Sequence, residues 1–318
     1  PARGQCRPRS GCGLGAGVSA STSPAVARRA LAADAALLAV TLIWGVTFPV
    51  VKAALAAASP LVFNAARMTL AALLLVAVYR PGFARLRREV WIVGALMGLC
   101  LAIGYALQTA GLALISPSIS AFLTSMNVVL VPLLLALGWR RRLGWPAWAG
   151  ALLALLGLYF LLAPAAAASG NLLGESLTLA CALAFAVQIV LLGEWAPRLG
   201  FRDLAVLQIV FAALFTWLGV PALSAWEAPR WHPTPALLGA VAATAVLATA
   251  LAFTVQSWAQ QFTPAAHAAV VFAFEPVFAW LAALWFWHEG LAWLQLLGAA
   301  LILAAMLATE LIKPPVRA

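Results

Sequence analysis

The sequence predicts an all-α integral membrane protein with ten transmembrane helices, arranged as two inverted five-helix repeats with both termini in the cytoplasm. Three observations predict this fold: the composition, the spacing of the apolar blocks and the placement of the basic residues. Of the 318 residues, 65% are hydrophobic and 9% are charged, whereas a soluble domain is about half apolar and about a quarter charged. This composition indicates a chain that lies mostly within a bilayer.

Apolar blocks long enough to cross a bilayer follow one another through residues 35–312. A spanning helix needs about 20 residues. We expect ten spans, at residues 35–55, 60–79, 90–110, 118–138, 145–163, 172–192, 204–224, 236–258, 265–287 and 290–312. The connectors are short, and pairs such as Ser59-Pro60 and Ser116-Pro117 favour helix starts, because proline suits the first helical position.

The segment before the first span is rich in Gly, Ser, Arg and Pro and has no hydrophobic periodicity. We expect residues 1–33 to form a disordered cytoplasmic tail. One repeat is expected at residues 34–165 and the second at residues 170–313. The four cysteines lie far apart and form no CxxC pair, so we expect neither a disulfide framework nor a metal site.

The basic residues support this count of spans. If the N-terminus lies inside, all but three of the 19 lysines and arginines fall in segments expected on the cytoplasmic side; the exceptions are Lys52, Arg67 and Arg230. Such an asymmetry follows the positive-inside rule, and one span more or fewer would break it. The net charge of +10 therefore indicates topology rather than nucleic-acid binding, for which no aromatic and basic groove is present.

The two halves of the chain are also similar to each other in sequence. One constant shift aligns, without a gap, Gln108 with Gln256, Trp139 with Trp287, Trp145 with Trp293 and Gly150 with Gly298. The same shift places Asn127 opposite Glu275. Since each half contains an odd number of spans, the second half crosses the membrane in the opposite orientation. Inverted repeats are typical of alternating-access carriers, with a site near the midplane.

Three features carry a resemblance to a known family. They are TLIWGVTFPVVKAAL in the first span, FNAARMTLAALLL after Ser59-Pro60 in the second, and prolines in the fourth and ninth spans, the latter as Glu275-Pro276. Residues 35–312 thereby resemble EamA-type transporters of the drug/metabolite transporter superfamily. The resemblance implies a ten-helix inverted-repeat carrier in the plasma membrane (the bacterial inner membrane), often exporting amino acids, metabolites or drugs.

One departure from the family pattern is visible. The family often has a Gly-Glu pair after the fourth and ninth spans, whereas this chain has WRRR at residues 139–142 and HEG at residues 288–290. Both places lie at membrane edges. We therefore assign no transport function to either place, although the family often has an acidic residue there.

Glu275 is the strongest candidate for a functional residue. It lies about ten residues into the ninth span, or about 15 Å along a helix, which is near mid-bilayer. A carboxyl group there costs about 2.5–3.5 kcal/mol by insertion scales and usually marks an ion or substrate path. Pro276 adds a kink that is tolerable beside a cavity. Glu275 could anchor a substrate amine or bind a proton, or it could be a protonated structural residue bonded to a neighbouring helix.

Seven further residues are candidates for substrate or proton binding: Arg67, Asn64, Asn127, Trp44, Gln108, Gln256 and Lys52. Arg67, with Asn64 one turn earlier, could hold a substrate carboxylate, or pair with helix carbonyls or with Glu275. Lys52 is better explained by snorkelling to the interface. Interhelical hydrogen bonds could also explain each of Trp44, Gln108, Asn127 and Gln256. His267 is expected near the inner boundary, where a structural function explains it better than a proton relay.

The function that these observations favour is secondary transport. We expect a small metabolite, amino acid or drug-like solute to move by alternating access, with export coupled to protons as the preferred mechanism. No GxxxxGK[ST] motor motif is present. We expect no enzyme activity, cofactor, metal or nucleic acid; the expected partners are a small-molecule substrate and the lipid bilayer, with a homodimer left open.

Two alternatives to a carrier fit the sequence less well. A membrane enzyme acting on a lipid-linked substrate needs a catalytic pair, but Asp34 and Asp203 are expected inside, and His232 and His288 outside. A channel usually needs repeated polar loops or oligomeric rings, and the outer connectors here are very short. Both alternatives are therefore less favoured than a carrier.

Overall fold

The structure is a computed structural model that describes residues 24–166, 171–224, 228–287 and 293–311. Its first half contains α1 (Pro24–Ala54), α2 (Pro60–Tyr79), the 3-10 helix η1 (Phe83–Arg85), α3 (Arg88–Leu114), α4 (Pro117–Ser125), α5 (Asn127–Leu137) and α6 (Trp145–Ala166). Its second half contains α7 (Leu172–Leu199), α8 (Phe201–Ala222), α9 (Pro235–Ala243), the π-helix η2 (Thr244–Leu251), α10 (Ala252–Ala259), α11 (Ala265–Phe272), α12 (Glu275–Trp287) and α13 (Trp293–Leu311).

The expected all-α membrane fold is confirmed. Eight helical segments among the described residues are long and apolar enough to cross a membrane: Arg28–Ala54, Pro60–Tyr79, Arg88–Leu114, Pro117–Leu137, Leu172–Leu199, Phe201–Ala222, Pro235–Ala259 and Ala265–Ala282. Two shorter apolar stretches, Trp145–Phe160 and Leu296–Thr309, stand where the fifth and tenth spans were expected.

The first helix begins earlier than expected. Residues 24–33 belong to the tail that we expect to be disordered, but α1 starts at Pro24 and continues through them. That part of the prediction is wrong, because the segment is rich in Ala and Arg, which favour helix, and proline suits a helix start. Residues 1–23 lie outside the described part of the chain.

The expected fourth and ninth spans are each broken near the middle. In the first half the break is at Met126, and α5 begins at Asn127; in the second it precedes α12, which begins at Glu275. These are the positions that the internal repeat aligns. Pro276 has no N–H to donate to the carbonyl of Phe272, which favours a break there. Broken helices at aligned positions of two repeats are typical of carriers.

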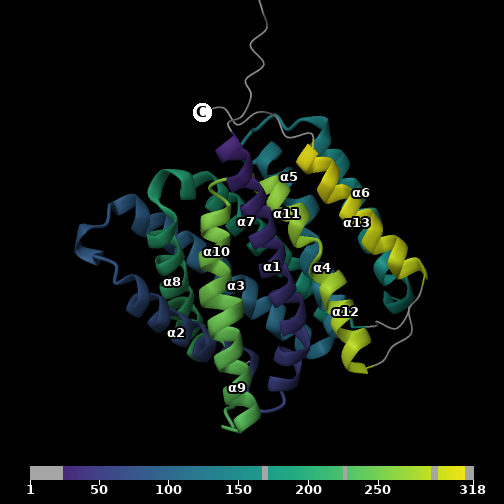
Figure 1. Cartoon of the computed structure of the whole chain (residues 1–318). Helices are drawn as coiled ribbons and strands as arrows, with labels where there is room; N and C mark the ends of the chain where they lie inside the picture. The colour runs from purple at the N-terminus through teal and green to yellow at the C-terminus, as the bar shows by residue number, and fades with distance from the viewer. Residues whose placement is uncertain (1–23, 167–170, 225–227, 288–292, 312–318) are drawn as a thin grey trace, which may run out of the picture.

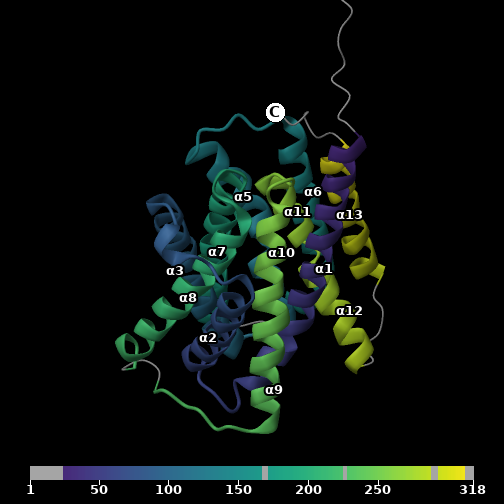
Figure 2. The same cartoon turned by 60° about the vertical axis from the view of Figure 1, so that its left-hand side comes forward.

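Helices from the two halves interleave in one bundle. In both views α12 and α13 lie on one flank and α2 and α8 on the other, with α1 and α10 between them (Figures 1 and 2). The start of α1 and the end of α13 lie at the same end of the bundle, and α9 starts at the opposite end (Figure 1). Extensive contacts between halves join α3 to α7 and α8, and α6 to α13.

Glycines allow the closest of these contacts. A Cβ atom added at Gly98 on α3 would lie 2.5 Å from the Cβ of Phe211 on α8 and 2.8 Å from the carbonyl oxygen of Gln208. A Cβ at Gly157 on α6 would lie 2.7 Å from the carbonyl oxygen of Gly298 on α13. Small residues let membrane helices approach to backbone contact, so these positions set the interhelical distances.

The connectors at the far end of the bundle from α1's start are also joined between the halves. Ala58 and Trp231 form an isolated antiparallel bridge. The Ser59 N–H donates to the Arg230 carbonyl at 3.1 Å, and the His232 N–H donates to the carbonyl of Ala57 at 2.8 Å. The α1–α2 connector therefore pairs with the segment that leads into α9.

Candidate functional site

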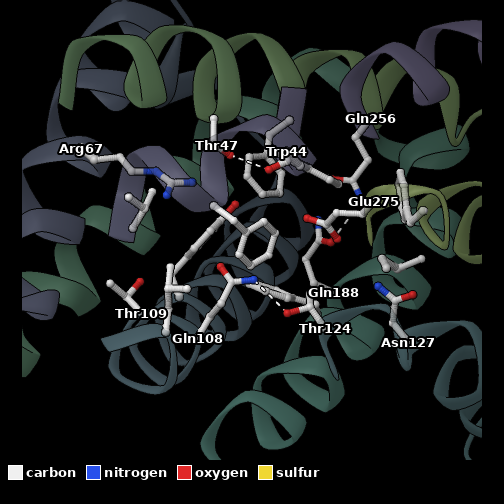
Figure 3. Close-up of a pocket in the computed structure, with 18 residues that line it drawn as sticks. Trp44, Thr47, Arg67, Gln108, Thr109, Thr124, Asn127, Gln188, Gln256 and Glu275 are labelled. Atoms are coloured by element: carbon white, nitrogen blue, oxygen red, sulfur yellow. Dashed lines mark hydrogen bonds between the residues drawn. The ribbon is translucent and has the colours of Figure 1, made fainter. Parts of the chain in front are cut away.

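A cavity lies between the two halves; it is partly open to solvent, and about 50 Å³ of it is available to the centres of water-sized molecules. Its 18 lining residues come from both repeats (Figure 3). The polar and amphipathic ones are Trp44, Thr47, Arg67, Tyr105, Gln108, Thr109, Thr124, Asn127, Gln188, Gln256 and Glu275; the apolar ones are Phe48, Val51, Leu112, Phe185, Ile189, Phe253 and Phe272.

Six of the eight residues proposed from the sequence meet in this cavity. They are Trp44, Arg67, Gln108, Asn127, Gln256 and Glu275. Two pairs that the internal repeat aligns, Gln108 with Gln256 and Asn127 with Glu275, thus line the same space. The cavity therefore lies where corresponding parts of the two halves face each other.

Glu275 is held where α12 crosses α1. It is the first residue of α12 and is 5% exposed. Its backbone oxygen lies so close to Gly45 that an added Cβ there would be 2.7 Å away. Within the described part of the chain, no hydrogen bond or ion pair is made by its carboxyl group. A carboxyl group buried in a membrane protein without such a partner is a candidate to bind a proton or a cation.

Arg67 lies at the opposite end of the cavity from Glu275 (Figure 3). Its Nε donates to Thr249 Oγ1 at 2.9 Å, and its guanidinium stands 4.2 Å from the centroid of the Tyr105 ring. These contacts hold the cation in place by a hydrogen bond and a cation–π interaction. The suggested pairing of Arg67 with Glu275 is not formed, so the cavity carries one cationic end and one acidic end.

Trp44 connects the cavity wall to the π-helical segment η2. Its Nε1 donates to the Ala248 carbonyl at 2.9 Å, and its ring packs against Phe272 and Phe253 with centroid distances of 5.3 and 5.6 Å. A π-helical segment disturbs the regular helical hydrogen bonds and often marks a functional site. Here the segment supplies both the carbonyl that fixes Trp44 and the hydroxyl of Thr249 that fixes Arg67.

A network of amide side chains borders the Glu275 end. Gln188 Nε2 donates to Gln208 Oε1 at 2.9 Å, and Gln208 Nε2 donates to Ser257 Oγ at 3.0 Å. Gln256 Nε2 lies 3.3 Å from Gln188 Oε1 and 3.0 Å from Gln260 Oε1. These bonds join α7, α8 and α10 and restrain the side chains that face the cavity.

Comparisons with known proteins agree with this architecture. The family model described as the EamA-like transporter family matches residues 31–163 and 172–310. The chain belongs to the EamA-like transporter family. The two matched ranges also confirm the two-repeat organisation of this EamA-like protein.

The relatives carry transporter names. An uncharacterized transporter of Archaeoglobus fulgidus is 32% identical over 286 residues, which cover 88% of this chain and 86% of that protein. The uncharacterized transporter YvbV of Bacillus subtilis is 27% identical over 194 residues, which cover 60% of this chain and 63% of that protein. A solved crystal structure superposes with a TM-score of 0.71 at 20% identity, covering 89% of this chain and 97% of that one; this likeness concerns the fold alone.

Two of the proposed residues lie outside the cavity of this EamA-like protein. Asn64 Nδ2 donates to the Tyr105 carbonyl at 3.0 Å and to Thr109 Oγ1 at 2.9 Å, so its amide joins α2 to α3. The ammonium group of Lys52 binds to the protein backbone and does not merely extend to the membrane interface. Its Nζ donates to the carbonyl oxygens of Leu112, Ala113 and Ile115 at 2.6, 2.9 and 3.1 Å.

Lys52 therefore caps the carboxyl end of α3, where a cation also interacts well with the helix dipole. We expect Lys52→Met to lower the stability of the protein by about 1–2 kcal/mol, because three carbonyl groups lose their donor. The measurement is the thermal unfolding midpoint in detergent, with Lys52→Arg as the variant that keeps the charge. An unchanged midpoint for Lys52→Met would contradict the capping function.

His267 lies apart from the cavity lining, beside the first part of α1 and the end of α13. Its Nδ1 is 3.0 Å from Thr309 Oγ1, and its Nε2 is 3.4 Å from Asp34 Oδ2. Thr263 Oγ1 also donates to Asp34, at 2.8 Å. The expected separation of His232 and His288 from Asp34 and Asp203 does not extend to His267, which contacts Asp34. The contacts join α11 to α1 and α13, as expected for a structural residue.

Several cavity residues were missed by sequence reasoning. Gln188 carries the same signal as Gln108, an amide within an apolar span, and could have been selected on that ground. Tyr105 and Thr124 carry no such signal, because Tyr and Thr are common in membrane helices and hydrogen-bond locally. Only their contacts, such as Gln108 Nε2 to Thr124 Oγ1 at 3.1 Å, place them at the site.

Proposed function

We propose that this EamA-like protein is a secondary carrier that exports a small metabolite, amino acid or drug-like solute across the plasma membrane by alternating access. The observation that carries the proposal is the cavity between the repeats, which has a buried acidic residue at a helix break and an arginine at its other end. A site at the junction of two repeats, lined by broken helices, suits alternating access because either half can move against it.

The proposed topology has ten spans, two inverted repeats and both termini in the cytoplasm. Helix α6 has 22 residues and α13 has 19, close to the length of about 20 that a bilayer requires, and they pack against each other. An even number of crossings agrees with the start of α1 and the end of α13 lying at one end of the bundle (Figure 1). The placement of the basic residues favours that end as cytoplasmic.

Proton coupling through Glu275 is the proposed mechanism. The carboxyl group is the acidic group of the cavity lining, and enclosing it in the apolar interior without a bound cation costs far less in its neutral form than in its charged form. Export of one solute molecule would then be linked to entry of a proton if both compete for Glu275. The alternative mechanism for the same carrier is facilitated diffusion or exchange of solutes, without proton coupling.

Transport assays in proteoliposomes test this function. The full chain is reconstituted, a pH gradient of either sign is imposed, and uptake of labelled amino acids and cationic dyes is measured against empty liposomes. We expect saturable flux whose direction follows the gradient. Absence of flux for every compound, together with conductance in a planar bilayer or turnover of a lipid-linked substrate, would favour the channel or the enzyme instead.

A further inference from the structure

We propose that the Glu275 end of the cavity is a binding site for a primary ammonium group of the substrate, built from the Glu275 carboxylate and the amide oxygens of Gln256 and Asn127. This inference rests on the proposed function, because it takes the cavity as the substrate site. It adds the chemical class of the group that the acidic end recognises. The three residues lie together at this end of the cavity (Figure 3).

Two buried amide oxygens at this end lack a hydrogen-bond donor. Gln256 Oε1 and Asn127 Oδ1 are both buried and make no hydrogen bond to the described residues; their residues are 1% and 4% exposed. In Gln256 the orientation of the amide is set, since its Nε2 faces Gln188 Oε1 and Gln260 Oε1. Asn127 can present either amide atom by turning over. Buried acceptors are rarely left without a donor, so a ligand that donates is expected here.

The set of acceptors distinguishes between kinds of ligand. A proton satisfies only the carboxyl group and leaves both amide oxygens without a partner. A primary ammonium carries one positive charge and three N–H donors, which matches one carboxylate and two amide oxygens. A quaternary ammonium has the charge but no N–H donor, so it would leave the same two oxygens unsatisfied.

The surroundings favour an organic cation over a bare metal ion. The Trp44 ring packs against Phe272 and Phe253 in the cavity wall, and aromatic faces attract ammonium groups and cover the carbon atoms attached to them. At the other end, the guanidinium of Arg67 disfavours a second cation. The cavity should therefore prefer a monoamine to a diamine of similar length.

The first repeat does not reproduce this arrangement. Gln108, aligned with Gln256, donates its amide to Thr124 Oγ1, and Asn127 stands where the second repeat has Glu275. The acidic charge therefore belongs to one half alone. This asymmetry gives the ligand one orientation in the cavity, with its ammonium group toward α12.

Binding to the purified full-length protein in nanodiscs tests the proposal, with isothermal titration calorimetry as the readout. The probes are phenethylamine, its N,N,N-trimethyl analogue, the neutral isostere 2-phenylethanol, and sodium chloride. We expect saturable binding of phenethylamine. The trimethyl analogue and the alcohol should each bind about tenfold more weakly or worse, because charge-assisted hydrogen bonds are lost.

Variants assign the binding to these side chains. Glu275→Gln and Gln256→Leu should each weaken phenethylamine binding about tenfold or more. The matched control is Gln261→Leu, because Gln261 bonds the Ala196 carbonyl and is not part of the cavity lining. Asn127→Asp adds an acidic acceptor and should tighten binding about threefold or more, which keeps the proposal testable if a loss-of-binding variant does not fold.

Three results would overturn the proposal. They are equal binding of the trimethyl analogue, competition by sodium at matched ionic strength, and no binding of phenethylamine. None of them bears on whether the protein is a carrier, since the proteoliposome assay would still detect flux of an anionic or neutral solute. Failure of the ammonium site and failure of the transport function are thereby separate outcomes.

Discussion

Replacing Glu275 with Gln is expected to abolish or uncouple transport while leaving the protein folded. The amide keeps the size and hydrogen-bonding capacity of the side chain, but it can neither carry a negative charge nor bind and release a proton. We expect gradient-driven flux in proteoliposomes to fall about tenfold or more, and residual flux to lose its dependence on pH. Size-exclusion profiles and the thermal unfolding midpoint report whether the variant is folded.

The control for this experiment is Glu194→Gln. Glu194 lies on α7 outside the cavity, where it pairs with Arg141 at 2.6 Å and Arg198 at 3.8 Å, and such partly exposed pairs contribute little to stability. We expect its flux to stay within about twofold of wild type. Wild-type flux with unchanged pH dependence in Glu275→Gln would reject a coupling function for that carboxyl group.

Gly45→Ala is expected to disturb the site where α1 crosses α12, because Gly45 lies on α1 against the start of α12. The added Cβ would lie 2.7 Å from the Glu275 carbonyl oxygen, 2.9 Å from the Phe278 Cβ and 3.0 Å from the Ala279 nitrogen. Two of these three atoms are backbone, so α1 and α12 must separate. We expect a stability loss of about 1–3 kcal/mol, measured as a lower unfolding midpoint, together with reduced flux.

Gly239→Ala is the matched control for this prediction. It makes the same substitution in α9, where an added Cβ meets nothing within 4 Å. The substitution should be neutral or slightly stabilising there, because Ala favours helix over Gly by about 1 kcal/mol. If Gly45→Ala behaved like Gly239→Ala, the close approach of α1 to α12 would not be required at the site.

Much of the architecture could be predicted because the bilayer constrains sequence strongly. A span must be apolar over a set length, and basic residues must gather on one side, so composition and charge placement predicted the fold class. A carboxyl group within such a span is costly, which singled out Glu275. The internal repeat paired it with Asn127, and both residues do line the cavity.

Contacts between distant residues could not be predicted in the same way. Nothing local indicates that Lys52 caps α3, that Arg67 bonds a threonine in a π-helical segment, or that His267 lies beside Asp34. Pro276 indicates the break before Glu275 already in the sequence. No residue in the sequence indicates the break at Met126, since Pro132 lies several residues further along α5.

The sequence by itself determined that this chain is a multi-span helical membrane protein with two related halves, and which polar residues lie within its apolar spans. Only the tertiary structure decided which of those residues face a common cavity and which, such as Asn64, tie two helices together. The physical reason is the solvent. In water, one apolar stripe marks the buried face of a helix, but lipid is as apolar as the protein interior. Helix α2 accordingly exposes Leu73 and buries Leu75, and no pattern of hydrophobicity separates the two.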